Sequence, residues 1–265
     1  MAGYKLLNFL SLPNSYPYKY ALIFFPYEKS TGFMKGTSKS WKEIIKQSHN
    51  IETYDFELGT NAVEKGISAF LISNKDDLKN VIEETKKHKA FNIFIGGEHT
   101  ISYWSSNFFH FNTFFLFDAH ADCMNLYKGK SLTHATWLRR LIEKKQKNIA
   151  FYISGLRIAS KEEHLFLKRH NVKTSKSFIK LHNKDIYLSI DLDALDMSAM
   201  PCCSNPEVAG FSWHELINNI AYLIKNNNVV AVDIVEHRPI KGLEFYSYAV
   251  GWLIYKILCL KEKYG

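Results

Sequence analysis

Three side chains that can bind metal ions follow a single apolar run in an alternating pattern. The run Phe114–Phe117 leads directly into Asp118, His120 and Asp122, with one alanine between each pair. Carboxylate oxygens and imidazole nitrogens are common ligands of divalent cations. A strand that ends in solvent with ordinary polar residues would have the same sequence. This segment alone therefore does not decide between the two interpretations.

The same arrangement recurs at three other places in the chain. The runs 91–95, 185–190 and 229–235 are also apolar, and each leads into polar residues. These residues are His99, which follows Gly96-Gly97-Glu98; Asp191 and Asp193, with Asp196 shortly after; and Glu236. Alternation places Asp191 and Asp193 on one face, where two like charges repel unless a cation lies between them. The repeated pattern therefore favours a metal site.

Strand-like and helix-like segments alternate along the chain and would position these side chains. The apolar runs predict strands buried on both faces, as in a parallel sheet covered by helices. Further strands are predicted at 20–25 and 51–58, and helices at 38–48 (with Ser38 or Ser40 as the N-cap), 75–87, 133–145, 160–170, 213–225 and 245–261. The alternation predicts an α/β fold with helices on both faces of a mainly parallel sheet. Ligands of such sheets bind beyond the carboxyl ends of the strands, where the polar side chains fall.

Length and composition exclude several classes of protein. A chain of 265 residues can bury a large core, and we expect residues 1–265 to form one catalytic domain. No apolar run is long enough to span a membrane, and the first residues do not resemble a secretory signal. The four cysteines form no paired C-x-x-C frame, which argues against a disulfide scaffold or a structural zinc site. We expect a cytoplasmic protein.

The formal net charge of +8 raises the question of nucleic-acid binding. The lysines are scattered, mostly on predicted helix faces, and no basic stripe is interleaved with aromatic residues. A solvated surface explains this distribution better than a nucleic-acid partner does. We therefore expect neither nucleic acid nor membrane as a partner.

With these residues identified, the chain resembles the ureohydrolase family, which includes agmatinases and arginases. Four motifs carry the resemblance: Gly96-Gly97-Glu98-His99, Asp118-Ala119-His120-Ala121-Asp122, the segment from Ser189 to Asp196, and Glu236 three residues before Pro239. The resemblance covers most of the chain. It implies the three-layer α/β/α sandwich of the arginase and deacetylase proteins, with a mainly parallel sheet of about eight strands.

Shorter segments are most similar to agmatinases. They are Ser30-Thr31-Gly32, Glu52-Thr53-Tyr54-Asp55, Thr133-His134-Ala135-Thr136 followed by Arg139-Arg140, Gly155-Leu156-Arg157 and Ser160-Lys161-Glu162-Glu163. The resemblance implies hydrolysis of the guanidino C–N bond of agmatine to putrescine and urea. It also implies a homo-oligomer, commonly a trimer or a hexamer.

The resemblance further implies a site for two Mn²⁺ ions. One ion would be held by His99, Asp118, Asp122 and Asp191, and the other by Asp118, His120, Asp191 and Asp193. Two imidazoles among four carboxylates form an oxygen-rich site, which suits Mn²⁺ better than a metal that prefers thiolates. Two divalent ions would lower the pKa of a water molecule between them.

Three residues receive catalytic roles by resemblance. Asp122 would take a proton from the attacking water, Glu236 would hold the guanidinium group, and His134 would shuttle protons. Simpler interpretations exist for two of them. Glu236 could be an ion-pair partner at a strand end, and His134 could be a polar residue at a helix N-terminus.

Four departures from the family pattern bear on the substrate. Met197 follows Asp196 where proline is usual, Cys202-Cys203 replace a glycine-containing loop, His237-Arg238 follow Glu236, and Met124 stands where arginases have asparagine. Bulk at the cysteines would narrow the pocket, and charge at Arg238 would favour a substrate with a carboxylate. The alternatives to agmatine are therefore arginine, guanidinobutyrate or formimidoylglutamate. A non-catalytic metal-binding paralogue is a further alternative.

Overall fold

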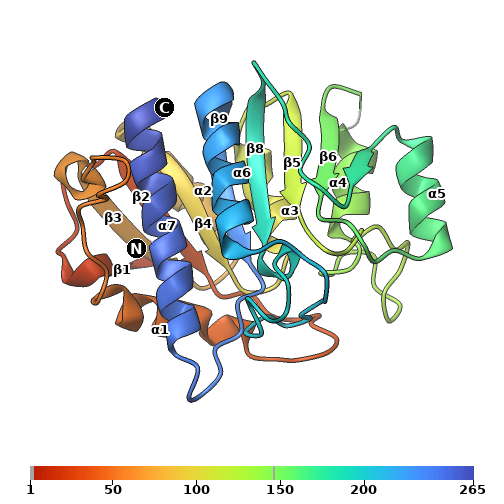
Figure 1. Cartoon of the computed structure of the whole chain (residues 1–265), viewed down its shortest axis with the longest axis horizontal. Helices are drawn as coiled ribbons and strands as arrows, with labels where there is room; N and C mark the ends of the chain where they lie inside the picture. The colour runs from red at the N-terminus through yellow and green to blue at the C-terminus, as the bar shows by residue number, and fades with distance from the viewer. Residues whose placement is uncertain (1–2, 146) are drawn as a thin grey trace.

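The computed structural model describes residues 3–145 and 147–265, which form one nine-stranded sheet between two layers of helices (Figure 1). The strand order is β1-β3-β2-β4-β9-β8-β5-β6-β7. The strands are β1 Tyr4–Leu7, β2 Tyr20–Phe25, β3 Ile67–Ile72, β4 Phe91–Gly96, β5 Thr113–Phe117, β6 Ala150–Ser154, β7 Lys173–Ser175, β8 Asp185–Asp191 and β9 Asn228–Val235. Only the edge pair β1–β3 is antiparallel among these strands.

The helices divide between the two faces of the sheet. They are α1 Ser40–Ser48, α2 Asp77–Lys87, α3 Ile101–Ser105, α4 Trp137–Lys145, α5 Lys161–Arg169, α6 Trp213–Asn226 and α7 Phe245–Tyr264. One apolar core joins α1, α6 and α7 to one face of the strands, and a second core joins α2, α3, α4 and α5 to the other face. This confirms the three-layer α/β/α sandwich, with one strand more than the expected eight.

The central strands are apolar along their whole length because both of their faces are covered. Every residue of β2 and of β5 is buried, so neither strand shows the alternation typical of a sheet with one wet face. Successive side chains therefore enter opposite cores: Phe115 belongs to one core, and its neighbours Phe114 and Leu116 belong to the other. None of the helices in the described residues is long and apolar enough to cross a membrane.

Two predictions about local structure are wrong. The segment 51–58 forms turns around an isolated bridge between Asp55 and Thr60, and the Asp55 side chain accepts the Leu58 N–H at 3.0 Å. The strand lies later, at β3. Neither Ser38 nor Ser40 caps α1: Ser40 Oγ donates to the Gly96 carbonyl at 3.0 Å, and Ser38 Oγ donates to Glu28.

The order of the strands brings distant segments together at one end of the sheet. Strands β9 and β8 lie between β4 and β5, so the four strands that carry the polar residues are direct neighbours. All four run parallel, and their carboxyl ends therefore lie at the same edge. This arrangement confirms that the polar side chains after these strands share one location.

The backbone after β4 passes very close to its neighbours at that edge. Gly97 N–H donates to Phe25 O at 3.1 Å, and Gly97 O accepts the Glu236 N–H at 2.9 Å. A methyl group on Gly97 would lie 2.1 Å from the carbonyl oxygen of Tyr27. Because that oxygen belongs to the backbone and cannot turn away, only glycine fits here.

The substitution Gly97→Ala should therefore destabilise the fold. We expect the free energy of unfolding to fall by about 3 kcal/mol, which is the upper end of the range for substitutions that add atoms to a packed core. Denaturant unfolding measures it. Gly129→Ala is the control, since a methyl there meets nothing within 4 Å and only its backbone φ of +76° is unfavourable. Its expected cost is about 1 kcal/mol. Equal losses in both variants would contradict the steric argument.

Candidate metal centre

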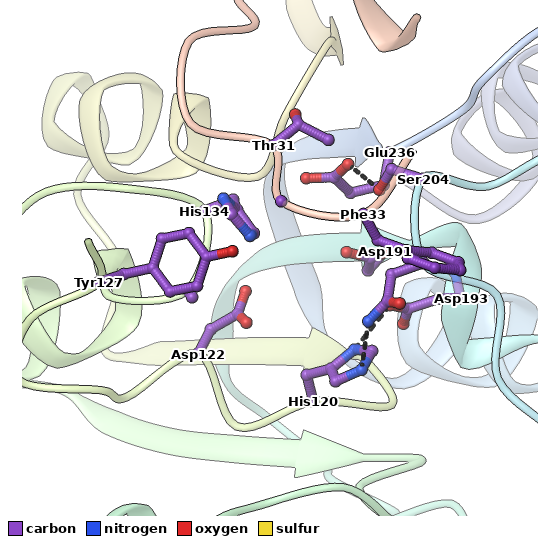
Figure 2. A pocket seen from close by; sticks show the side chains of 13 residues that line it. Thr31, Phe33, His120, Asp122, Tyr127, His134, Asp191, Asp193, Ser204 and Glu236 are labelled. Carbon is purple, nitrogen blue, oxygen red and sulfur yellow. Dashed lines mark hydrogen bonds and ion pairs between the residues drawn. The ribbon is translucent and has the colours of Figure 1, made fainter. Parts of the chain in front are cut away.

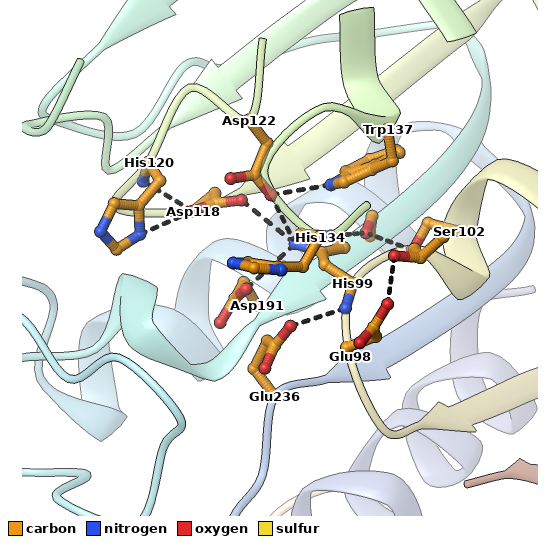
Figure 3. Close-up of polar contacts among 12 residues, drawn as sticks. Glu98, His99, Ser102, Asp118, His120, Asp122, His134, Trp137, Asp191 and Glu236 are labelled. Atoms are coloured by element: carbon orange, nitrogen blue, oxygen red, sulfur yellow. Dashed lines mark hydrogen bonds and ion pairs between the residues drawn. The ribbon is translucent and has the colours of Figure 1, made fainter. Parts of the chain in front are cut away.

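His99 lies among three carboxylates just beyond the sheet (Figure 3). Its Nδ1 lies 3.0 Å from Asp191 Oδ2, 3.3 Å from Asp118 Oδ2 and 3.4 Å from Asp122 Oδ2. The four residues follow or end strands β4, β5 and β8, and all are buried. His99, Asp118 and Asp191 each offer one ligand atom within 4.8 Å of the others, so they can hold one metal ion.

A second triad shares one carboxylate with the first. Asp118, His120 and Asp193 also bring ligand atoms within 4.8 Å of one another. His120 Nδ1 lies 2.8 Å from Asp193 Oδ2 and 3.7 Å from Asp118 Oδ1. The two oxygens of Asp118 therefore face different triads. This geometry forms a candidate binuclear metal site.

The donor atoms fit a pair of divalent ions. His99 Nδ1 and Asp118 Oδ2 are fully buried, and neither has a hydrogen-bond partner in the described structure. Buried polar atoms are normally paired, so two unpaired ligand atoms that face each other indicate a missing partner. Four aspartates gather at the site, and in the described residues their side chains form ion pairs only with histidines, not with lysine or arginine. Buried negative charges need positive partners, and metal cations would supply them here.

The protein without metal holds protons at this site. Burial and the charge of Asp193 raise the pKa of Asp191 to about 7. Burial lowers the pKa of His120, but Asp193 and Asp118 outweigh it and raise the value to about 11. Burial and the charges of the three neighbouring aspartates also raise the pKa of Asp118 well above its usual range. Carboxylates this close cannot all ionise without a cation.

A buried hydroxyl and a buried carboxylate orient His99 from behind. His99 Nε2 lies 3.0 Å from Ser189 Oγ, and Ser189 Oγ donates to Asp233 Oδ1 at 2.6 Å. Since the hydroxyl proton goes to Asp233, Ser189 must accept from His99, which places the ring proton on Nε2. The lone pair of Nδ1 is then directed at the metal site. Such outer contacts set the orientation and basicity of a metal ligand.

The loop after β8 also contacts the ring of His120. His120 Nε2 lies 3.3 Å from Glu207 Oε1 and 2.8 Å from the side-chain amide of Asn205. Arg157 holds this loop through backbone carbonyls alone. The acceptors are Gly155 O, Asp193 O, Leu195 O, Glu207 O and Val208 O, at 2.7 to 3.2 Å.

Two predicted catalytic residues have left-handed backbones. Asp122 has φ 48° and Glu236 has φ 66°, conformations that are uncommon for residues with a side chain. Asp122 Oδ2 accepts the indole N–H of Trp137 at 2.7 Å, and Asp122 is in neither of the two tightest triads. Glu236 Oε1 accepts the backbone N–H of His99 at 2.6 Å, and Ser204 donates to Oε2. Backbone strain of this kind clusters at functional sites.

A cavity of about 330 Å³ opens above the two triads. Figure 2 shows His134 and Tyr127 on one side of it, with Asp191 and Glu236 on the other. The residues that line it are Thr31, Gly32, Phe33, His120, Asp122, Tyr127, His134, Ala135, Asp191, Asp193, Ser204, Asn205 and Glu236. The three predicted catalytic residues and four of the six predicted ligands therefore line one cavity, and the other two ligands, His99 and Asp118, are buried.

Comparison with known proteins gives a consistent result. The arginase family model matches residues 18–259. The agmatinase of Pyrococcus horikoshii is 27% identical over 237 residues, which cover 82% of this chain and 83% of the relative. The N(1)-aminopropylagmatine ureohydrolase of Synechocystis is 25% identical over 88% of this chain and 86% of its own. The crystal structure of agmatine ureohydrolase of Thermoplasma volcanium superposes with a TM-score of 0.84, at 21% identity over 98% and 96% of the two chains.

The chain belongs to the arginase family. It is a ureohydrolase, the class that hydrolyses C–N bonds of linear amidines. Family membership implies a small guanidino substrate. The two relatives described above are named for different substrates, so the family does not by itself identify the compound.

The departures from the arginase-family pattern lie outside the cavity. Cys202 and Cys203 are fully buried in the core and do not narrow the opening. His237 is buried between Cys202 O and Ser247 Oγ, and burial lowers its pKa to about 4. Arg238 donates to Cys203 O. Neither residue lines the cavity, so the expected effect of their charge on the substrate is wrong.

Several residues that shape the site were not predicted from the sequence. Ser189 lies inside β8 and Asp233 inside β9. A polar residue within an otherwise apolar run is the sequence signal that could have identified them. Trp137 opens α4, and nothing in its own segment indicates a bond to Asp122. Their roles depend on which strand lies beside which, and this information is absent from a local pattern.

Replacing the carboxylate behind His99 should weaken metal binding. In Asp233→Asn, the neutral amide can offer Ser189 either a donor or an acceptor, so Ser189 is no longer forced to accept the His99 proton on Nε2. We expect metal affinity to fall by about 10- to 100-fold, measured by titration calorimetry. Asp185→Asn, at the exposed opposite end of β8, is the control and should bind as the unsubstituted protein does. Equal affinity in both variants would show that Asp233 does not orient the ligand.

Metal-induced stabilisation should increase with pH. Asp191 and His120 hold protons in the metal-free protein because their pKa values are raised to about 7 and about 11. Metal binding displaces these protons, so apparent affinity rises with pH. The increase in Tm with Mn²⁺ relative to a chelator should be larger at about pH 8 than at about pH 6. Asp118→Asn, which lacks the shared ligand, should show little increase at either pH. A larger increase at the lower pH would contradict the assignment.

Proposed function

We propose that the protein is a binuclear manganese amidinohydrolase that converts agmatine to putrescine and urea. The observation that supports it most is the pair of triads sharing Asp118 at the floor of an acidic cavity. A guanidinium group is cationic, and the cavity offers it the carboxylate of Glu236, which is in neither triad.

The cavity also favours a substrate whose far end is not a carboxylate. Among its lining residues in the described structure there is no lysine or arginine. Phe33, which is 72% exposed, and Tyr127 give the cavity an aromatic part. Aromatic faces attract ammonium groups, whereas a carboxylate would find no charged partner here. Agmatine and the longer aminopropylagmatine both have a cationic tail.

The oxygen-rich donor set supports Mn²⁺ as the metal. His99, Asp118, Asp122 and Asp191 would hold one ion, and Asp118, His120, Asp191 and Asp193 the other. When bound, the two ions supply Lewis acidity that makes water a stronger acid near neutral pH.

The residues of the chain would bind the substrate and move its protons. Glu236 would orient the guanidinium group by charge-assisted hydrogen bonds, since each of its oxygens keeps a lone pair beside its protein donor. Asp122 would accept a proton from the attacking water and deliver it to the leaving nitrogen. Burial lowers the pKa of His134 despite the nearby charges of Asp122 and Glu98, so its ring is neutral and can carry protons. One C–O bond forms, one C–N bond breaks, and the amine leaves as ammonium beside urea.

A second cavity favours a different substrate. It holds about 340 Å³ and lies next to the first, with Thr31, Gly32 and Tyr127 lining both. Lys29, Lys35, Lys128 and Lys130 line it. These lysines would suit a carboxylate tail, as in arginine, guanidinobutyrate or formimidoylglutamate. We therefore keep such substrates as the second candidate.

We also propose the broader setting of the enzyme. Residues 1–265 would act as one catalytic domain within a trimer or hexamer. Phe56, which is 92% exposed, supports contact with another subunit. The four cysteines are free and buried, which supports a reducing compartment such as the cytoplasm.

Product release from a substrate panel tests the proposal. We expect Mn²⁺-dependent urea release, with higher kcat/KM for agmatine or aminopropylagmatine than for arginine or guanidinobutyrate. Formimidoylglutamate is followed by formamide. Asp118→Asn controls for metal-dependent turnover and should be inactive. A Lys128→Ala/Lys130→Ala variant should leave agmatine kinetics unchanged.

Two outcomes would count against agmatine. A preference for a carboxylate-tailed compound, with a raised KM in the double lysine variant, would establish the second candidate. Absence of product from every compound, with two metal ions bound per chain, would indicate a non-catalytic paralogue.

A further inference from the structure

The hydroxyl group of Ser30 makes every hydrogen bond that it can make. It donates to Glu98 Oε1 at 2.7 Å and accepts the backbone N–H of His134 at 2.9 Å. Its third neighbour is His134 Nδ1, at 3.1 Å. A serine hydroxyl has one proton and two lone pairs, so these three contacts fill it.

The direction of the Ser30 proton follows from the surroundings of Glu98. This carboxylate is fully buried next to the metal ligand His99 and does not join either triad. Its Oε2 accepts backbone N–H groups of Lys29 at 2.7 Å, Ser30 at 2.6 Å and Thr31 at 3.2 Å. Thr100 Oγ1 lies 2.6 Å from Oε1. Since an ionised carboxylate only accepts, Ser30 must donate to it.

The tautomer of His134 is then determined. Because Ser30 gives its proton to Glu98, it can only accept from the ring, and His134 Nδ1 must carry a hydrogen. In a neutral imidazole the other nitrogen is then an acceptor. His134 lines the cavity, so this arrangement leaves Nε2 as the proton acceptor of the ring (Figure 2).

Two further contacts keep the His134 ring in place. The edge of the Tyr127 ring meets it, with centroids 4.9 Å apart and planes at 77°. Gly32 lies so close that a methyl group there would be 2.0 Å from the Tyr127 hydroxyl and 3.7 Å from His134 Nε2. The segment from Ser30 to Gly32 therefore limits the position of the ring from one side, and Tyr127 limits it from another.

We propose that Ser30 is a positioning residue that holds His134 with Nδ1 protonated and Nε2 free to receive a proton at the bound guanidinium, and that Glu98 fixes the Ser30 hydroxyl. This inference rests on the proposed function, because it concerns the residue assigned there to move protons. In this arrangement Glu98 of the Gly-Gly-Glu-His motif also connects the segment after β4, which carries His99, to the loop after β2. Ser30 acts only through His134.

Steady-state kinetics of Ser30 variants test the proposal on the manganese-loaded protein. Ser30→Ala should lower kcat by about tenfold or more, with KM and bound metal within about twofold of the unsubstituted protein. Ser30→Thr keeps the hydroxyl and should recover most of kcat. Ser38→Ala is the matched control: it removes a hydroxyl that bonds Glu28 at 2.6 Å in the same connection between β2 and α1, and kcat should not change.

A double variant separates positioning from an independent effect. If Ser30 acts through His134, the variant Ser30→Ala/His134→Ala should be no slower than His134→Ala alone. Additive losses in kcat would overturn the proposal. So would a Ser30→Ala variant that resembles Ser38→Ala, or one in which only KM or metal content changes.

A spectroscopic measurement distinguishes failure of this inference from failure of the proposed function. In ¹⁵N-histidine-labelled, zinc-loaded protein, the signals absent from His134→Gln belong to His134. They should show a protonated Nδ1 in the unsubstituted protein and a mixture of tautomers in Ser30→Ala. This result would stand even if no substrate released urea, in which case only the proposed function fails. A protonated Nε2 in the unsubstituted protein would overturn the Ser30 assignment whatever the activity.

Discussion

Repulsion among buried carboxylates is the constraint on which the site depends. Asp118, Asp122, Asp191 and Asp193 converge where water is largely excluded, with histidine rings as their ion-pair partners in the described structure. Such a cluster is unfavourable unless cations enter it or protons stay bound. The raised pKa values in the metal-free protein follow from this, as does the affinity for divalent ions. The same repulsion therefore destabilises the metal-free protein and favours the binding of divalent cations.

The topology of the sheet creates that convergence. Because β8 and β9 lie between β4 and β5, four chain segments far apart in sequence end side by side. Two apolar cores cover the faces of these strands, and the cavity lies at their carboxyl ends. His99 is then supported from behind by neighbouring strands, through Ser189 on β8 and Asp233 on β9. The sheet brings the ligands to one edge, and the segments after the strands, such as the loop that contacts His120, complete their positions.

Prediction from the sequence succeeded where the signal was local. An apolar run followed by a polar side chain appears within ten residues, and this was enough to predict the central strands and the polar side chains that converge beyond them. It failed where the outcome depends on a neighbour. The strand expected at 51–58 forms turns, and the real strand β3 follows it. Cys202 and Cys203 seemed to face the substrate, but they are buried in the core because the chain turns at Ser204 and Asn205, which line the cavity in their place.

The way in which Arg157 holds the loop after β8 affects how this enzyme could change. In the described residues, its guanidinium group donates hydrogen bonds only to main-chain oxygens, which every amino acid possesses. Val208, which is exposed and does not line the cavity, can therefore be exchanged during evolution while the loop keeps its attachment. This part of the loop can vary without displacing the candidate metal ligands beneath it.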